Sequence, residues 1–180
     1  VDVVCSNPDY YQESIDYVAK LGDTAFIIIG NVKDIAITDR QMFIGIYDFQ
    51  LDNIFDTVVG DPNIIHTFYN HLIDGNLLLS VGAKGPGTTQ QTVLYISDIF
   101  GNFIHEKTFE QEGWVITSIV HPEGTNFYHL YQYWSTDHKF YVLNKNTLET
   151  DTLFEYPLGF LPRDAMNAPD AGEYYVAGRQ

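Results

Sequence analysis

Short apolar runs rich in Val, Ile, Tyr and Phe, separated by glycine and aspartate turns, follow one another along the chain. The middle of the sequence shows this best. The stretch "DGNLLLSVG" at 74–82 is a turn followed by an apolar run, and "VLYISDIFGNFIHEKTF" at 93–109 is two runs around a Gly-Asn turn. Apolar runs this short, bounded by turn residues, predict strands joined as hairpins. We therefore expect no helix longer than a turn or two.

The apolar run that ends in glycine occurs several times. It reads "GDTAFIIIG", "DGNLLLSVG" and "DAGEYYVAG", and a further copy, "EGTNFYHLYQ", has Gln132 where the others have glycine. Successive copies are about 50 residues apart, and a strand before each copy and a hairpin after it give four strands per repeat. Four-stranded antiparallel units of this length predict the blades of an all-β β-propeller. A two-sheet sandwich, the alternative fold, leaves the fixed period unexplained.

The repeats divide the chain into blades at about 14–59, 66–109 and 115–156, a partial blade at 163–180 and one further strand within 1–8. Propellers close with about four to eight blades, so we expect either a single propeller domain or part of a longer one. The continuous apolar run predicts a strand buried on both faces between neighbouring blades, and we expect it to be the inner strand. Its terminal glycine allows a close backbone approach or a sharp exit.

Composition narrows the possible partners and compartments. The 180 residues include 9 Lys and Arg against 24 Asp and Glu, and this net charge of -15 disfavours nucleic acid and anionic lipid. No apolar stretch is long enough for a membrane span. The single cysteine, Cys5, cannot form an internal disulfide. Lipidation of Cys5 is an alternative to a small buried hydrophobe, but Val4 stands where acylation sites have a small residue.

The stretch "VLYISDIFGNFIHEKTF" and the final "DAGEYYVAG" resemble the tandem β-propeller repeats of secreted and cell-surface proteins of the Bacteroidota. Those units read as an Asp-Gly-Gly-Tyr-apolar-Gly strand, then an apolar strand ending in Asp, a Gly-Asn turn and a Lys-Thr strand. The resemblance implies a propeller fold and an extracytoplasmic address, with no catalytic residue to carry over. The stretch "KFYVLNKNTLETDTLFEYP" is equally similar to blades of quinoprotein-type or surface-layer propellers.

Motifs for catalysis, metal binding and cofactor binding are missing from the sequence. The loop "GAKGPGTTQ" is rich in glycine, but its lysine lacks the following Ser or Thr of a phosphate loop. The six histidines show no metal-ligand spacing, and no nucleophile elbow occurs. We therefore expect no metal, no cofactor and no catalytic residue that the sequence can identify.

One repeat differs from its sisters in a way that suggests a binding surface. The stretch "NFYHLYQYWSTDH" at 126–138 has aromatic residues and histidines where the other copies have aliphatic residues and glycine. Larger aromatics that fill a wider gap between blades are one explanation. The other is a site for a glycan or a peptide, in which aromatic side chains stack on the ligand and the following loop supplies hydrogen bonds. Its candidate residues are Tyr131, Tyr133, Trp134, Asp137 and His138.

Loops after the glycine strands and links between blades should meet on one rim of a propeller, where binding residues collect. This rim adds Arg40, Lys84 and Trp114 to the candidates. The sequence favours a non-catalytic binding or scaffolding module of a secreted or surface-attached protein, with a protein or glycan partner. A propeller glycosidase or lyase with catalytic residues from different blades is one alternative. A structural subunit of an outer-membrane assembly, within a larger complex, is the other.

Overall fold

The computed structural model describes residues 10–34, 40–60, 65–85, 91–112, 115–121, 124–134, 137–155, 161–167 and 174–179. Every regular element in these ranges is a strand. The first eight are β1 (Tyr10–Leu21), β2 (Ala25–Asp34), β3 (Arg40–Asp48), β4 (Asn53–Val59), β5 (Ile65–Asp74), β6 (Leu77–Gly85), β7 (Gln91–Asp98) and β8 (Phe103–Glu112). The others are β9 (Val115–Val120), β10 (Phe127–Trp134), β11 (Asp137–Asn144), β12 (Thr150–Glu155), β13 (Leu161–Asn167) and β14 (Tyr174–Arg179).

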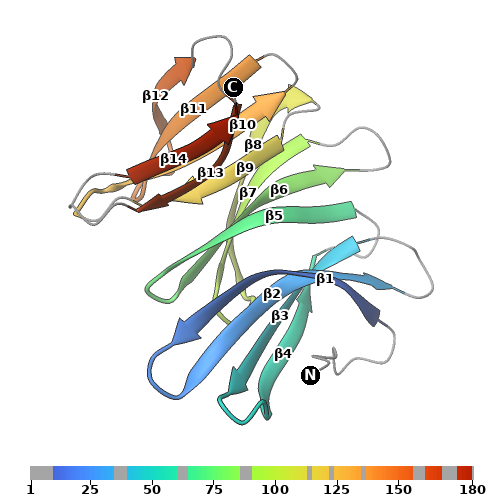
Figure 1. Cartoon of the computed structure of the whole chain (residues 1–180). Coiled ribbons are helices and arrows are strands. Elements are labelled where there is room, and N and C mark those ends of the chain that lie inside the picture. Colours follow the sequence, from blue (N-terminus) through green and yellow to red (C-terminus); the bar gives the residue numbers. More distant parts are fainter. Residues whose placement is uncertain are drawn as a thin grey trace.

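Consecutive strands pair with each other and form one sheet after another along the chain (Figure 1). The described strands make three four-stranded antiparallel sheets, β1 to β4, β5 to β8 and β9 to β12, and β13 pairs with β14. These are propeller blades, so the predicted all-β propeller fold class is confirmed. The expected blades at 14–59, 66–109 and 115–156 compare with observed sheets at 10–59, 65–112 and 115–155. Cys5 and the strand expected within 1–8 lie outside the described residues.

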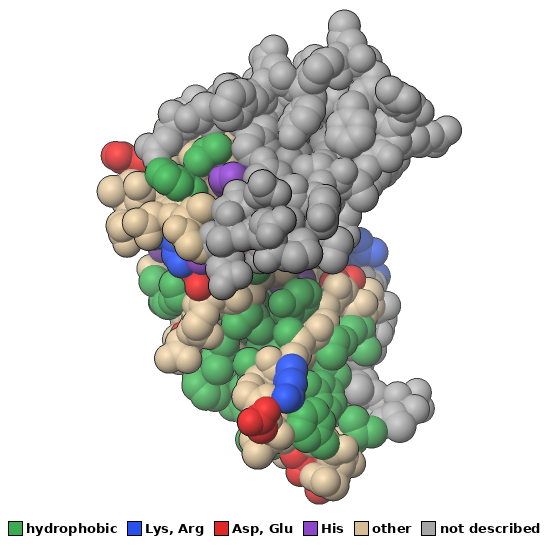
Figure 2. Space-filling model, turned by 60° about the vertical axis from the view of Figure 1, so that its left-hand side comes forward, with side chains coloured by type: hydrophobic (Ala, Val, Ile, Leu, Met, Phe, Trp, Pro, Cys, Tyr) green, Lys and Arg blue, Asp and Glu red, His purple; other side chains and the backbone are tan. Residues whose placement is uncertain are grey.

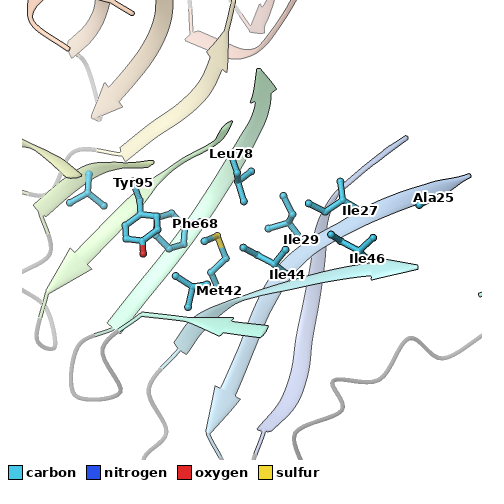
Figure 3. Packing of buried hydrophobic residues seen from close by; sticks show 11 residues of the cluster. Ala25, Ile27, Ile29, Met42, Ile44, Ile46, Phe68, Leu78 and Tyr95 are labelled. Atoms are coloured by element: carbon cyan, nitrogen blue, oxygen red, sulfur yellow. The ribbon is translucent and has the colours of Figure 1, made fainter. Parts of the chain in front are cut away.

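The middle sheet packs against a neighbouring sheet on each of its faces, because successive side chains of a strand point to opposite sides. Leu78 of β6 joins one apolar cluster with the first sheet, while Leu79 joins a second cluster with the third sheet. Figure 3 shows the first cluster between the two sheets. Its buried members are Ala25, Ile27, Ile29, Met42, Ile44, Ile46, Val59, Phe68, Leu78, Val93 and Tyr95. The continuous apolar runs of β2 and β6 are therefore buried on both faces, as predicted.

The expectation that the glycine strand is the inner strand is wrong. In each complete sheet this strand is second in the order, between the first and third strands. The first strands are the ones that follow one another in space: β1 contacts β5, β5 contacts β9, and β9 contacts β13. A strand hydrogen-bonded on both edges and covered on both faces needs an apolar sequence, so the apolar run marks the middle of a blade instead of its inner edge.

Gly30 and Gly82 are required because the neighbouring first strand crosses directly over them. A Cβ atom at Gly30 would lie 2.0 Å from the carbonyl oxygen of Ser14, and one at Gly82 would lie 2.1 Å from that of Thr67. Both carbonyls belong to first strands that bulge beside the glycine. The repeat glycine therefore permits a close backbone approach, which was one of the two roles predicted for it.

A polar network ties the second sheet to the third near the β5–β6 turn. The Asp74 carboxylate lies 2.5 Å from Lys145 Nζ and accepts a hydrogen bond of 2.7 Å from the Tyr128 hydroxyl. Burial pushes the pKa of Asp74 upward, but hydrogen bonds from Lys145 and Tyr128 outweigh it and hold the pKa below its usual value. His121 completes the group, with Nδ1 3.8 Å from Asp74. This network fixes how the two sheets meet at their edge.

Hydrophobic side chains also reach the surface at the level of the first sheet (Figure 2). Ile15 and Val18 of β1 pair with Gly30 and Ile28, so they share the face directed away from the second sheet. Both are exposed, whereas Ile28 is buried. This face of the first sheet is therefore apolar and partly open. No helix among the described residues has the length and hydropathy to cross a bilayer.

The turns after the third strands repeat one hydrogen-bonding device. Asp48 Oδ1 accepts the backbone N–H groups of Gln50 and Asp52, each at 2.9 Å. Asp98 does the same for Phe100 and Asn102 in the next sheet. Such turns place one residue in the left-handed region, where glycine is free of the steric cost that other residues bear. Gly101 has a φ of 83° there, but Leu51 has 71°.

Replacing Leu51 with glycine is expected to stabilise the protein by about 1 kcal/mol, since it removes a strained left-handed leucine. Leu51 is 41% exposed, so little burial is lost. Gly101→Ala is the matched opposite change, because it puts a side chain at a left-handed position. The new Cβ would also lie 2.7 Å from Val59 Cγ2. The substitution should cost about 1 to 3 kcal/mol. Urea unfolding measures both, and shifts of the two variants in the same direction would contradict this account.

Candidate functional site

A hollow of about 540 Å³ lies between the first and second sheets, near the ends of β2 and the starts of β3 and β5. Its volume falls within the range of roughly 300–1,000 Å³ typical of small-molecule sites. Most of its described lining residues have a polar group, and their apolar atoms contribute about as much to the lining as their polar atoms. These residues are Ser14, Asp16, Asn31, Arg40, Thr67, Phe68 and Tyr69.

Two β-bulges build the walls of this hollow. In β1, Ile15 pairs with Gly30 and Tyr17 pairs with Ile29, so Asp16 is the extra residue. In β5, Phe68 pairs with Gly82 and Asn70 pairs with Val81, so Tyr69 is the extra residue. A bulge redirects a side chain out of the regular alternation of its strand. Asp16 and Tyr69 therefore line the hollow because they are the extra residues of the bulges. In a regular ladder each would have a pairing partner and would follow the normal alternation of faces.

Asn31 connects the two sheets at the hollow and is only 6% exposed. Its Nδ2 donates to Asp16 Oδ2 at 2.5 Å and to the carbonyl oxygen of Phe68 at 3.3 Å. These acceptors fix the orientation of the amide, because an oxygen in that place would face other oxygens. Asn31 Oδ1 is buried, and no described residue donates a hydrogen bond to it. A buried acceptor without a donor is costly, so this oxygen favours a ligand or water that can donate to it.

The charges at the hollow are one carboxylate and one guanidinium. Partial burial raises the pKa of Asp16, although hydrogen bonds from Ser14 and Asn31 and the charge of Arg40 oppose the rise. Burial also raises the pKa of Tyr69, again opposed by the charge of Arg40. At neutral pH the tyrosine is therefore a hydroxyl that can donate and accept. Tyr69 is 43% exposed, so part of its surface is available to a ligand.

The groups around the hollow can form hydrogen bonds and ion pairs with a polar ligand. Carboxylate, amide, guanidinium and hydroxyl groups converge on one space and offer both donors and acceptors. Among the described residues that line the hollow, Asp16 supplies a carboxylate and Arg40 a guanidinium. Within the described ranges, no group of three or more His, Cys, Asp or Glu residues could hold a metal ion.

A histidine lies buried between the same two sheets. The ring of His71 packs 5.9 Å from that of Tyr17 and 6.3 Å from that of Phe68, measured between centroids. His71 Nδ1 is 2.8 Å from Ser80 Oγ, which itself donates to Met42 Sδ. Nε2 is buried and has no hydrogen-bond partner among the described residues. Burial lowers the pKa of His71 to about 3, so the ring is neutral at physiological pH.

Of the three candidates predicted from the rim loops, Arg40 and Lys84 have different surroundings. Arg40, which was predicted as a binding residue, lines the hollow. Lys84 is engaged in an ion pair with Glu106 on β8, with 2.9 Å between Nζ and Oε1. This pair joins β6 to the outer strand of the same sheet. Trp114 lies outside the described residues.

The aromatic candidates lie on the β10–β11 hairpin. Tyr131, Tyr133 and Trp134 belong to β10, whose backbone alone is described there. Asp137 and His138 were expected in a loop, and this is wrong. Both belong to β11, where Asp137 pairs with Trp134 and His138 pairs with Tyr133. The last pair of the ladder is Trp134 with Asp137, which leaves two residues of sequence between the strands. Antiparallel strands can be joined by so short a link.

Sequence reasoning missed Asp16, Asn31 and Tyr69. Asn31 directly follows the repeat glycine, where the second copy has Ala83, so a polar residue at this repeat position was a usable signal. The bulges were not visible, because an extra residue in one strand appears only when its pairing partner is known. The glycine of the second strand indicated that another backbone approaches closely. It did not indicate which residue of the first strand leaves the regular alternation.

Comparisons with known proteins identify no family. No protein-family model matches the chain, and no curated protein matches it. Among solved structures, the chain is similar to a subtype N10 neuraminidase-like protein of A/little yellow-shouldered bat/Guatemala/060/2010. The sequence identity is 12% and the TM-score is 0.47. The match covers 77% of this chain but 44% of the other, so the chain spans less than half of that protein. The likeness concerns the arrangement of strands alone.

The buried His71 predicts a specific dependence of stability on pH. Its pKa is about 3 in the folded protein and about 6.5 when unfolded, so the unfolded chain takes up the proton first as the pH falls. The contribution of neutral, buried His71 to the free energy of unfolding is fully present above pH 6.5 and is progressively lost below it. At pH 5 the loss is about 2 kcal/mol.

His71→Gln, which cannot titrate, should lose about 2 kcal/mol less than the wild type when urea unfolding at pH 7 is compared with pH 5. Comparing each protein with itself removes the effect of the substitution on stability at pH 7. Equal losses in both proteins would mean that His71 is protonated in the folded state.

Proposed function

We propose that this chain is a non-catalytic binding module and that the hollow between its first two sheets binds a glycan. The observation that carries the proposal is Asn31 Oδ1, a buried acceptor to which no described residue donates, in a hollow that also holds Asp16, Arg40 and Tyr69. Sugar hydroxyls donate and accept hydrogen bonds at closely spaced positions. They can supply a donor to Asn31 and Asp16 and an acceptor to Arg40 at the same time.

A ring face supports the choice of a sugar over a smaller polar molecule. Tyr69 is partly exposed beside these polar groups, and an aromatic surface next to hydrogen-bonding groups suits the apolar face of a pyranose. The net charge of -15 opposes binding of nucleic acid and of anionic lipid surfaces. Arg40 provides a positive charge within the hollow itself, so an acidic sugar is compatible with the site.

The aromatic hairpin is a second contact surface in this proposal. Trp134 pairs with Asp137 next to the link between β10 and β11, which places an indole and a carboxylate at adjacent positions of the backbone ladder. The proposal assigns to this hairpin a peptide or a glycan as partner. Its support is the replacement of the repeat glycine by Gln132 and the concentration of aromatic residues in this copy.

The proposal includes the cellular location of the protein. The resemblance of "VLYISDIFGNFIHEKTF" to repeats of secreted and surface proteins supports an extracytoplasmic location. A scaffolding role within an outer-membrane assembly is the competing description. It would be favoured by a partner chain that buries more than about 1,000 Å² of this protein.

Glycan-array binding tests the proposal for the hollow. The wild type is expected to retain at least one class of oligosaccharide, and Tyr69→Ala and Arg40→Gln should each weaken that signal about tenfold or more. Lys20→Gln is the matched control for Arg40→Gln. It removes the same charge from an exposed side chain at the β1–β2 turn, away from the hollow.

Two other outcomes would redirect the assignment. Binding that survives both hollow substitutions but is lost in Trp134→Ala would move the site to the aromatic hairpin. Release of free sugar from the bound glycan would instead identify an enzyme. No retained glycan at all would overturn the proposed function.

A further inference from the structure

The bulge that builds the hollow occurs in all four first strands. In β9, Ile116 pairs with Gln132 and Ser118 pairs with Tyr131, which leaves Thr117 as the extra residue. In β13, Pro162 pairs with Gly178 and Asp164 pairs with Ala177, which leaves Arg163. At this bulge the extra residues of the four strands are therefore Asp16, Tyr69, Thr117 and Arg163, and β1 has a second extra residue, Glu13, between Gln12 and Ser14.

These four positions are equivalent in register. Each bulge lies next to the residue opposite the repeat glycine or its substitute. The four residues of the second strands are Gly30, Gly82, Gln132 and Gly178. The bulge therefore persists in the third sheet, where the glycine is absent. Because the bulge is kept where Gln132 replaces the glycine, the bulge does not depend on the glycine. It is a feature of the fold, and the glycine accommodates it.

The topology brings the four positions into one row. The first strands contact one another in chain order, β1 with β5, β5 with β9 and β9 with β13. Figure 1 shows these strands side by side, from the blue sheet to the dark red pair. Facing sheets are separated by roughly 10 Å, so the row is longer than a single sugar ring.

Two members of the row already form the walls of the hollow. Asp16 and Tyr69 come from neighbouring bulges and line the same space. Thr117 and Arg163 occupy the same register positions in the next two sheets. In chain order the residues at these four positions are an aspartate, a tyrosine, a threonine and an arginine.

We infer that the hollow is the first subsite of an extended surface along the four bulges, and that its ligand is an oligosaccharide instead of a single sugar. This inference rests on the proposed function. The sugar at the first subsite donates to Asp16 and Asn31, and later sugars meet Thr117 and Arg163. Each further subsite adds contacts without a new cost of translational freedom, so affinity should increase with chain length until the row is filled.

Isothermal titration calorimetry with chito-, cello- and malto-oligosaccharides of one to five units tests this. The wild type is expected to bind at least one series, with an affinity about tenfold or more higher for the tetrasaccharide than for the monosaccharide. Arg163→Gln should reduce this gain and leave affinity for the monosaccharide unchanged. Tyr69→Ala should weaken every member that binds. Thr117→Ala, a smaller change, should reduce the gain in the same way and serves if Arg163→Gln does not fold.

The outcomes separate this inference from the proposed function. Equal affinity for all members of a series would overturn the extended surface and leave the single site in place. The same conclusion follows if Arg163→Gln and Thr117→Ala both fold and leave the gain with length unchanged. Failure of every sugar to bind, in these series and on the glycan array, would overturn the proposed function itself.

Discussion

The rest of the structure depends on the bulge in each first strand, which lies beside a glycine of the second strand in every described sheet except the third, where Gln132 takes its place. At Gly30 and Gly82 the carbonyl oxygen of the first strand occupies the space that a Cβ atom would need. This contact is possible because the first strand bulges there, and the bulge displaces Asp16 and Tyr69 from the regular alternation. One local constraint therefore explains both the repeated sequence phrase and the residues that line the hollow.

Packing of the sheets converts this local geometry into a site. The middle sheet buries Leu78 against the first sheet and Leu79 against the third, so neighbouring sheets are held face to face by apolar contact. Stacking then brings bulges from different sheets together, and residues far apart in sequence, such as Asp16 and Tyr69, share one space. Asn31 adds a polar connection between the two sheets, and its unpaired oxygen distinguishes this space from an ordinary gap between blades.

The sequence was sufficient for the fold and insufficient for most of the site. Apolar runs, turn residues and a period near 50 are local signals, and they predicted the strands and their grouping into blades. Arg40, which lines the hollow, was among the predicted binding residues because it follows the glycine strand in sequence. Asp16 and Tyr69 could not be predicted, since strand register decides which residue is displaced. Asp137 and His138 were assigned to a loop because sequence does not show where the β10–β11 ladder ends.

The central claim is that the bulged residues of successive first strands form one binding surface. Backbone amide shifts in NMR spectra, recorded during titration with a tetrasaccharide from a series that binds, test it most directly. The account predicts the largest changes around residues 16, 69, 117 and 163, with little change at the turns of residues 49–51 and 99–101. Changes confined to those turns or to the β10–β11 hairpin would contradict it.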